Sequence, residues 1–437
     1  MNVQQVFTTA NAVDTFEIGG GAKGTPVGVI LFPCTSLGDD FANRLASRGG
    51  TGMVTYKDTT ITQGFCGGNV DGTDGATCYA ARAQSQSGAY VACWSDAGGQ
   101  TINFKYACTG VGVGGGLLFE REVVDGGGNT YGYEMAFNCM VFYPGDTAEI
   151  ETGVWNGGGA TSVFVPTGFN PNLVFTASVG AVFTGADVVT SNAYNALGVG
   201  FRNEFESTWT NKCYSTRVSD NTASMTCASY MNNTNHFGIL SSAALARTIN
   251  LTSDSGGYTN NISAAENEGY MYMAIKLPDN YFASFQDWIR LNSTTSRTVW
   301  TTGRMEPQIT MTTFISFASS FDTTGVKTSS TYSLFNSLTD SEGVTATSNW
   351  AADDANATAK AKDTTSTNSI KGTSYNVTSG TEFVADFVIP SRFGPMQSFT
   401  SAFNSTVGWV LQIGKVYNES SGVRQVFVGS DPVESFG

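Results

Sequence analysis

The sequence predicts an all-β protein built of three tandem, similar antiparallel β-sandwich domains with a jelly-roll-like arrangement. Only 13% of the 437 residues are charged, while aromatic residues reach 12% and glycine occurs 51 times. Strands rich in β-branched and aromatic residues, joined by Gly, Asn, Asp and Ser turns, have this composition. The aromatic content also argues against a disordered chain.

A repeat of domain length supports the domain count. Apolar runs beside a proline recur about 140 residues apart, at residues 24–32, 170–175 and 306–311. Each is followed later by a closing apolar run, at residues 133–137, 270–275 and 409–413. A period of this length indicates tandem domains of one architecture, and one domain per ~150 residues gives the same count. We predict domains at residues 1–147, 148–290 and 291–437.

Short apolar runs between turn residues predict the individual strands. They lie at residues 27–32, 53–56, 101–106, 173–177, 179–183, 383–389 and 423–428, and residues 1–15 form an arm or a first strand. Glycine-rich hairpin turns are expected at 111–116 and 126–129, and a boundary turn at 144–147. Apolar residues at three- and four-residue spacing predict a short linker helix at 281–291. The alanine-rich segment 351–362 predicts an exposed loop or a short surface helix.

Charge and segment patterns limit the partners. The net charge of −14 disfavours binding to phosphate backbones and to anionic bilayers, so neither nucleic acid nor membrane is expected as a partner. The first residues lack the basic and apolar regions of a signal peptide, and no apolar run has the length of a transmembrane helix. We therefore expect a soluble protein made in a cytosol.

The cysteines are distributed unevenly. The first predicted domain contains six (Cys34, Cys66, Cys78, Cys93, Cys108 and Cys139), the second contains Cys213 and Cys227, and the third contains none. Because the third copy must fold without disulfides, packing is expected to stabilise all three. Buried free thiols are the expectation for a chain without a secretory signal. Cys213 and Cys227 are the best candidates for a bridge if one exists.

Residues that could carry catalysis are sparse. His236 is the only histidine, and its polar sequence neighbourhood predicts a surface residue without a catalytic role. Carboxylates occur close together at Asp39–Asp40, Asp353–Asp354 and Glu266/Glu268, but neighbours on a strand point to opposite faces. Residues 69–75 are similar to a calcium-binding loop, although a β-turn explains them as well. We predict no catalytic, cofactor-binding or metal-binding residues and no cofactor, and the sequence leaves binding residues unassigned.

The module itself resembles a known class of protein. A proline followed by alternating apolar residues, a Gly/Ser/Thr-rich middle and an apolar closing strand resembles a repeated β module of tailed-bacteriophage virion proteins. The second copy carries the pattern best, at Gly168-Phe169-Asn170-Pro171. The resemblance implies a tail-associated, fibre or head-decoration protein located in the virion and assembled in the host cytoplasm. Its implied partners are other virion proteins and copies of itself, with host-surface glycan as a further partner.

The sequence therefore favours a non-enzymatic virion structural protein, exposed as head decoration or tail appendage. Three like units in one chain can also act as a pseudo-trimer on a threefold or sixfold position. One alternative is a glycan-binding adhesin or depolymerase. Another is the capsid shell protein of a small virus, which normally has a basic arm that residues 1–15 lack.

Overall fold

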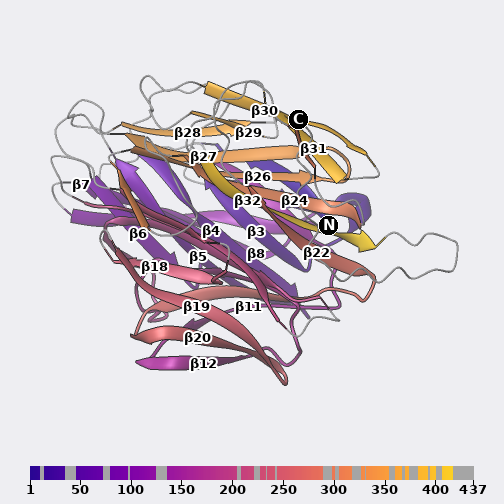
Figure 1. Ribbon diagram of the computed structural model, residues 1–437, viewed down its shortest axis with the longest axis horizontal. Coiled ribbons are helices and arrows are strands. Elements are labelled where there is room, and N and C mark those ends of the chain that lie inside the picture. The colour runs from indigo at the N-terminus through magenta and orange to yellow at the C-terminus, as the bar shows by residue number, and fades with distance from the viewer. Residues whose placement is uncertain are drawn as a thin grey trace, which may run out of the picture.

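The prediction of an all-β protein is confirmed. The computed structural model describes residues 1–9, 14–34, 46–71, 79–96, 99–124, 135–203, 208–220, 227–232, 234–241, 244–288, 298–300, 305–316, 326–329, 331–353, 360–366, 370–373, 382–391, 394–399 and 406–416. Within these ranges the regular structure consists of strands, joined to their neighbours in antiparallel pairs, and one short 3-10 helix at Gly21–Lys23. Figure 1 shows the sheets stacked across the molecule.

The strands fall into three sets that follow one another along the chain. The first set contains β1 (Asn2–Phe7), β2 (Thr15–Ile18), β3 (Gly28–Cys34), β4 (Ala46–Lys57), β5 (Thr60–Asp71), β6 (Tyr79–Ser85), β7 (Tyr90–Asp96), β8 (Gly99–Val111), β9 (Leu117–Val123) and β10 (Ala136–Phe142). The second contains β11 (Glu149–Asn156), β12 (Ala160–Pro166), β13 (Leu173–Ala177), β14 (Val188–Ser191), β15 (Ala193–Phe201), β16 (Thr210–Val218), β17 (Cys227–Asn232), β18 (Phe237–Ser241), β19 (Ala244–Asp254), β20 (Gly257–Glu266) and β21 (Gly269–Lys276). The third contains β22 (Tyr281–Trp288), β23 (Thr298–Trp300), β24 (Met305–Ser316), β25 (Val326–Ser329), β26 (Thr331–Asp340), β27 (Thr345–Asp353), β28 (Lys360–Ser366), β29 (Ile370–Thr373), β30 (Glu382–Ser391), β31 (Gly394–Phe399) and β32 (Thr406–Val416).

Each set repeats one strand order. The large sheets run β1-β10-β3-β4-β5-β6, β11-β21-β13-β15-β16-β17 and β22-β32-β24-β26-β27-β28. The four-stranded sheets run β2-β9-β8-β7, β12-β20-β19-β18 and β23-β31-β30-β29. The opening and closing runs of the sequence repeat therefore become neighbouring strands, because β3 pairs with β10, β13 with β21 and β24 with β32. That each set folds as an independent domain stays a prediction.

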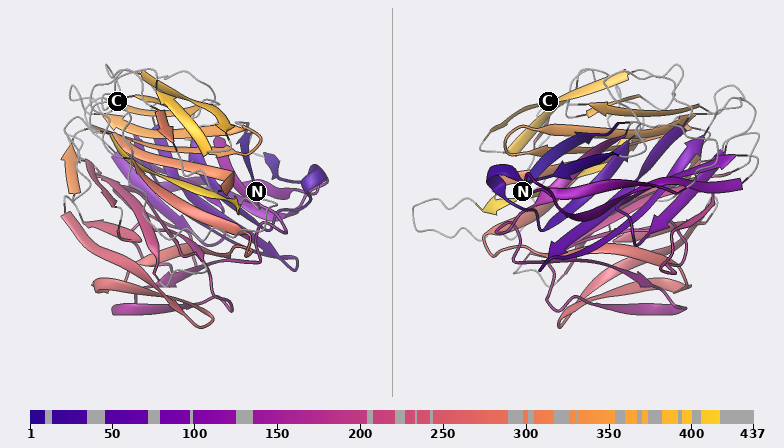
Figure 2. Two further views of the ribbon diagram at one scale, coloured as in Figure 1. Left: turned by 45° about the vertical axis from the view of Figure 1, so that its right-hand side comes forward. Right: turned by 180° about the vertical axis from the view of Figure 1, so that it is seen from behind.

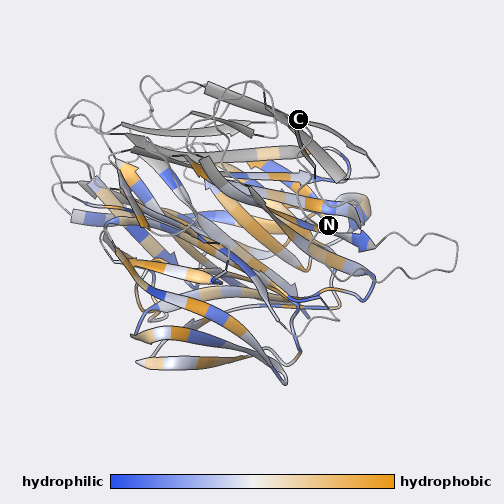
Figure 3. Ribbon diagram, viewed as in Figure 1, coloured by the Kyte–Doolittle hydropathy of each residue, from blue (hydrophilic) through white to orange (hydrophobic). Residues whose placement is uncertain are grey.

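The large sheets are buried on both faces. Successive residues of a strand point to opposite faces, and all seven residues of β3 are buried. Val29 and Leu31 point into the sandwich interior of the first set, whereas Ile30 and Phe32 join an apolar core that includes residues of all three sets. Figure 3 shows hydrophobic residues along the central strands of the molecule. One face of each sheet thus builds a sandwich, and the other binds its neighbours.

The sets contact one another head to tail. From the first set to the second, β5 packs against β11 and β15. From the second to the third, the amide Nδ2 of Asn336 on β26 donates to the hydroxyl of Tyr214 on β16 at 3.2 Å. From the third back to the first, β27 packs against β1, β3 and β4. At each contact the fifth strand of one large sheet meets the fourth strand of the next: β5 meets β15, β16 meets β26, and β27 meets β4. The left view of Figure 2 shows the three sets grouped around one centre.

Two strands cross from one set to the preceding one. β14 of the second set pairs with β6 as the seventh strand of the first large sheet, and β25 of the third set pairs with β17 in the same way. Both donated strands have the sequence Val-x-Thr-Ser, at 188–191 and 326–329. Along the chain, β14 lies between β13 and β15, and β25 lies between β24 and β26. Backbone hydrogen bonds, in addition to apolar packing, thereby join consecutive sets.

Several local predictions are confirmed. Strands were predicted correctly at 27–32, 53–56, 101–106, 173–177 and 383–389, and residues 2–7 form a first strand. The hairpin turn predicted at 111–116 lies between β8 and β9, and the boundary turn lies at 144–147. The strand at 423–428 and the turn at 126–129 lie outside the described residues.

Other local predictions are wrong. Residues 281–288 form strand β22, which pairs with β32, so the predicted linker helix is a strand of the third large sheet. Residues 351–353 and 360–362 belong to β27 and β28 and pair with each other, which contradicts a loop or a surface helix there. Of the closing run expected at 133–137, residues 133 and 134 lie outside the described residues, and the strand that includes residues 136 and 137 extends to Phe142. Residues 179–183 form an irregular connection instead of a strand.

Candidate functional site

An extended network of polar contacts lies at the joint between the first two sets. Residues 178–191, which we call the strap, connect β13 to β15 and include the donated strand β14. Three polar side chains near the end of β6 reach toward this strap, namely Arg82, Gln84 and Ser85. The strap is thus held by a strand of the preceding set.

Side-chain hydrogen bonds satisfy backbone N–H and C=O groups in the irregular part of the strap. Arg82 Nη1 donates to the carbonyl of Val179 at 2.6 Å, and Gln84 Nε2 donates to that of Val182 at 2.5 Å. On the other side, Asn156 Nδ2 donates to the carbonyl of Phe183 at 3.0 Å and its Oδ1 accepts from the Phe183 amide at 2.9 Å. These contacts explain why residues 179–183 need no ladder partner, although their apolar sequence resembles a strand.

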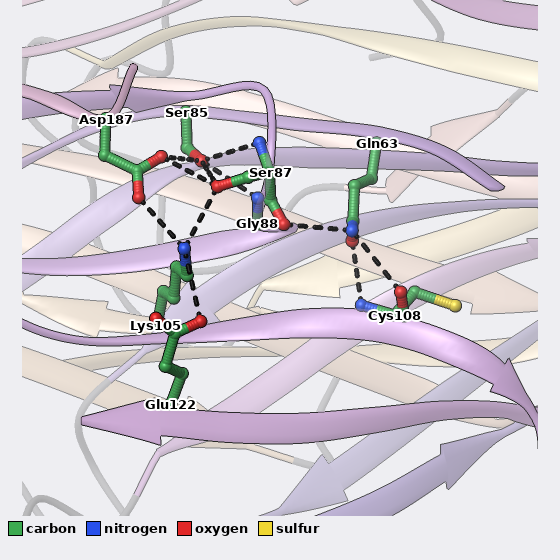
Figure 4. A network of polar contacts seen from close by, with 8 residues as sticks. All are labelled: Gln63, Ser85, Ser87, Gly88, Lys105, Cys108, Glu122 and Asp187. Carbon is green, nitrogen blue, oxygen red and sulfur yellow. Dashed lines mark hydrogen bonds and ion pairs between the residues drawn. The ribbon is translucent and has the colours of Figure 1, made fainter. Parts of the chain in front are cut away.

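Asp187 anchors the end of the strap. Its Oδ1 accepts hydrogen bonds from Ser85 Oγ at 2.5 Å and Ser87 Oγ at 3.0 Å, and its Oδ2 lies 3.2 Å from Lys105 Nζ. Lys105 also lies 3.2 Å from Glu122 Oε2. Figure 4 shows these side chains converging from the first set and the strap. Burial would lower the pKa of Lys105, but the hydrogen bonds and charges of Asp187 and Glu122 outweigh it and raise that pKa.

The hydrogen bonds of Ser85 indicate a structural role and do not suit a nucleophile. Its Oγ donates to Asp187 and accepts from the backbone amides of Ser87 at 3.1 Å and Gly88 at 2.9 Å, so the bonding capacity of the hydroxyl is used. A Ser–Lys catalytic pair needs a neutral lysine as base, whereas the raised pKa keeps Lys105 protonated. Ser85 and Lys105 therefore hold the strap in place.

Gln63 extends the network along the first set. Its Nε2 donates to the carbonyls of Ser87 at 3.0 Å and Cys108 at 3.3 Å, and its Oε1 accepts from the Cys108 amide at 2.8 Å. Figure 4 shows Gln63 between the turn that follows β6 and strand β8. The large and small sheets of the first set are thus tied together beside the strap.

The prediction for His236 is wrong in its location. The side chain is fully buried, and its Nε2 lies 2.7 Å from Thr176 Oγ1. Burial lowers the pKa of His236 to about 3, and a contact with the backbone of Val199 opposes this only in part. The imidazole is consequently neutral at physiological pH. A Cβ on Gly198 would lie 1.9 Å from the His236 carbonyl oxygen, which shows how closely β15 approaches this residue.

Ala89 of the first set occupies the position equivalent to His236, and its side chain has no catalytic group. A Cβ on Gly52 of β4 would lie 2.0 Å from the carbonyl oxygen of Ala89, just as Gly198 meets His236. The amides of Ala89 and His236 each donate at 2.8 Å to the neighbouring strand of the small sheet. An alanine therefore occupies the equivalent position, and the imidazole fills space and bonds Thr176 within the second sandwich.

The candidate carboxylate pairs do not form a described site. Glu268 lies 3.7 Å from Arg247 Nη1, while Glu266 ends β20. Asp353 ends β27, and Asp39, Asp40 and Asp354 lie outside the described residues. Of the calcium-like segment, residues 69–71 belong to β5 with Asn69 buried, and residues 72–75 lie outside the described part. Among the described residues, no group of three His, Cys, Asp or Glu side chains could hold a metal ion.

The cysteines are buried free thiols wherever the structure describes them. This holds for Cys34, Cys66, Cys93, Cys108, Cys139, Cys213 and Cys227. Cys213 lies opposite Asn232, and Cys227 lies opposite Val218. The two are five positions apart along the paired strands, a separation of about 16 Å that no disulfide can span. Burial raises the pKa of the Cys93 thiol to about 12, which makes it unreactive.

A second polar junction joins all three sets. The N-terminal amine of Met1 pairs with Asp146 in the turn between the first two sets, and the Tyr281 hydroxyl at the start of the third set donates to the same carboxylate at 3.0 Å. The amide of Val3 donates at 2.9 Å to Asp340, which lies at the end of β26. These contacts fix the places where the chain enters successive sets.

The comparisons with known proteins identify no family. No family model matches the chain, and no curated protein matches it. Among solved structures, a fructofuranosidase from Schwanniomyces occidentalis in complex with fructose aligns with 91% of this chain and 98% of its own, at 6% identity and a TM-score of 0.16. A variant of that protein in complex with fructosylnystose aligns at 7% identity and a TM-score of 0.14, covering 84% of this chain and 78% of its own. Overlap this low carries no argument about function. Within the described residues, no helix is long and apolar enough to cross a membrane.

Proposed function

We propose that this chain is a non-enzymatic structural protein of a bacteriophage particle, exposed as head decoration or as part of a tail appendage. The observation that carries the proposal is one strand order repeated three times in sets that contact each other head to tail. Head-to-tail contacts build closed rings when the rotation closes. A chain with three such sets suits a threefold position of a particle, or one part of a sixfold ring.

The polar joints support an assembly role. Ser85, Lys105 and Asp187 are engaged in holding the strap, and His236 is buried in the second sandwich. The contacts that could have suggested catalysis therefore connect structural elements. Each set is proposed to be one domain of the pseudo-trimer, with the turn at 144–147 and the segment 277–280 as the connections.

The proposal is tested by locating the chain on a particle. Purified virions that encode it should contain the protein in a copy number that matches a symmetric position, and a low-resolution image of labelled particles should place it on the exterior. A monodisperse monomer that never co-purifies with virions would contradict the proposal. Glycan hydrolysis that is lost when a carboxylate is replaced would favour a depolymerase instead.

A further inference from the structure

Strand β12 forms an exposed edge of the four-stranded sheet of the second set. It pairs with β20 on one side, and no described strand pairs with its other side. Figure 1 shows β12 at the lower rim of the molecule, outside β20, and both views of Figure 2 agree. In an antiparallel ladder, every second residue of an edge strand directs its N–H and C=O groups away from its partner. The outer edge of β12 therefore offers a row of backbone donors and acceptors to another strand.

The equivalent edges of the other two sets are shorter, and one of them is partly covered. β2 has four residues and β23 has three, whereas β12 has seven. The side chain of Gln4 lies along β2, since its Nε2 donates to the Glu17 carbonyl at 3.3 Å and its Oε1 accepts from the Gly19 amide at 2.7 Å. Within the described residues, no side chain bonds to the backbone of β12 in this way. The second set thus leaves open an edge that the first set partly closes.

β12 also lacks the charges that protect exposed edges. Natural edge strands commonly carry charged residues, above all lysine, that disfavour the addition of another strand. β12 has the sequence Ala-Thr-Ser-Val-Phe-Val-Pro, and no charged residue occurs between residues 152 and 186 of a chain whose net charge is −14. Val163 and Val165 pack on the core, whereas Phe164 is 48% exposed. β-Branched and aromatic residues of this kind favour strand pairing.

The surface beside this edge carries little charge. Five neighbours of Phe164 on the same face of β12, β20 and β19 are uncharged, namely Ser162, Thr259, Asn261, Asn250 and Thr252. The carboxylate of Asp254, at the end of β19, is bonded to the Thr259 hydroxyl. A copy of the same chain therefore meets little like charge at this edge, although the chain as a whole is acidic.

We propose that the outer edge of β12 pairs with β12 of a second copy, antiparallel and across a twofold axis, so that the two four-stranded sheets become one continuous sheet. The molecule already joins its own sets by strand addition, since β14 extends the sheet of β6 and β25 extends that of β17. In a twofold contact each strand meets an identical strand, so an uncharged edge is suited to pairing with itself. This inference goes beyond the virion proposal and does not rest on it.

The size of the edge sets the expected strength of the contact. Two paired strands of seven residues with two Phe164 side chains cover less than the ~1,200 Å² of a stable interface. We therefore expect a weak dimer with a Kd on the order of 100 μM. Such a contact becomes populated where copies are held close together, because tethering raises their effective concentration.

Sedimentation equilibrium of the full chain tests the proposal. Between about 5 μM and about 1 mM, the weight-average mass should rise from that of one chain toward that of two. Phe164→Lys places two positive charges against each other across the axis and should weaken pairing at least about tenfold. Val113→Lys is the matched control, since it makes the same kind of exchange at a fully exposed apolar residue between β8 and β9. It should leave the Kd within about twofold of that of wild type.

Hydrogen exchange locates the contact. At the highest concentration, the outward-directed amides of β12 should exchange more slowly than at the lowest, whereas the amides of β2 should exchange equally at both. Ser162→Lys, on the same exposed face, serves in place of Phe164→Lys if that variant fails to fold. The proposal would be overturned by a wild-type chain that stays monomeric throughout, by equal weakening in Phe164→Lys and Val113→Lys, or by a dimer in which the amides of β12 are not slowed.

Discussion

At the scale of single residues, His236 shows how position decides chemistry. The only histidine of the chain stands where the first set has Ala89, and close backbone approach by a glycine fixes both positions. Sequence reasoning placed it on the surface because its neighbours are polar. The fold buries it instead, because the residue immediately before β18 lies beneath the large sheet. A polar neighbourhood in sequence is therefore a weak guide to exposure in a sandwich.

The buried imidazole predicts a pH dependence of stability. The folded pKa of His236 is about 3, below the unfolded value of 6.5, so its contribution is fully present above pH 6.5 and is lost as pH falls toward 3. Between pH 7 and pH 5 this amounts to about 2 kcal/mol of the free energy of unfolding. Denaturant unfolding of His236→Ala, which copies the first set, should show a pH dependence smaller by that amount. Wild type and variant with equal pH dependence would show that His236 does not stay neutral on burial.

At the scale of elements, the sequence predicted strands well where apolar residues form a near-continuous run. The proline-linked opening runs became β3, β13 and β24, since near-continuous apolar runs such as residues 29–32 suit sheets buried on both faces. Prediction was wrong at β22, where the spacing of the large apolar residues imitates that of a helix. Phe282, Phe285 and Trp288 follow helical spacing, yet β22 pairs with β32, which lies more than a hundred residues later. Within β22 the pattern is that of a strand, because Tyr281 and Ala283 are buried and Phe282 is exposed.

The polar joint was beyond sequence reasoning because its residues are far apart in the sequence. Ser85 and Asp187 are about a hundred residues apart and belong to different sets. Neither stands in a motif of its own. The one available signal was the recurrence of Val-x-Thr-Ser at 188–191 and 326–329, which marks the donated strands. A four-residue match is short, but its place between equivalent opening strands distinguishes it from chance.

The strap predicts a local effect of substitution. Asp187→Asn removes the charge that faces Lys105 and weakens the acceptor for Ser85 and Ser87, so β14 should separate more readily from β6. We expect amide hydrogen exchange at residues 188–191 to quicken about tenfold or more, the equivalent of losing one charged hydrogen bond. Exchange in β25 should not change.

The matched control is Asp254→Asn on the exposed hairpin between β19 and β20, where the carboxylate bonds Thr259. It makes the same chemical change away from the joint and should leave exchange in β14 as in wild type. Uniform acceleration across all sheets in Asp187→Asn would mean that the residue supports global stability and not the strap.

At the scale of the whole molecule, the shared core predicts cooperative unfolding. One apolar cluster includes Ile30 of the first set, Phe175 of the second and Met311 of the third. Because each large sheet buries its outer face against another set, loss of one set would expose apolar surface on the others. Differential scanning calorimetry should therefore show a single transition with equal calorimetric and van't Hoff enthalpies. Three separate transitions would show that the sets are independent domains joined only by short connections.

Because one chain connects the three sets, the joints between them can differ in sequence. Three identical subunits around an axis must show every surface feature three times or not at all. In this chain the first joint carries Arg82 and the second carries Ala228, so one side of the ring differs from another. A particle built from such a molecule can orient it, and neighbours can recognise a single side. A chain that contains all three sets can therefore have a surface feature at one joint alone, which a trimer of identical subunits cannot have.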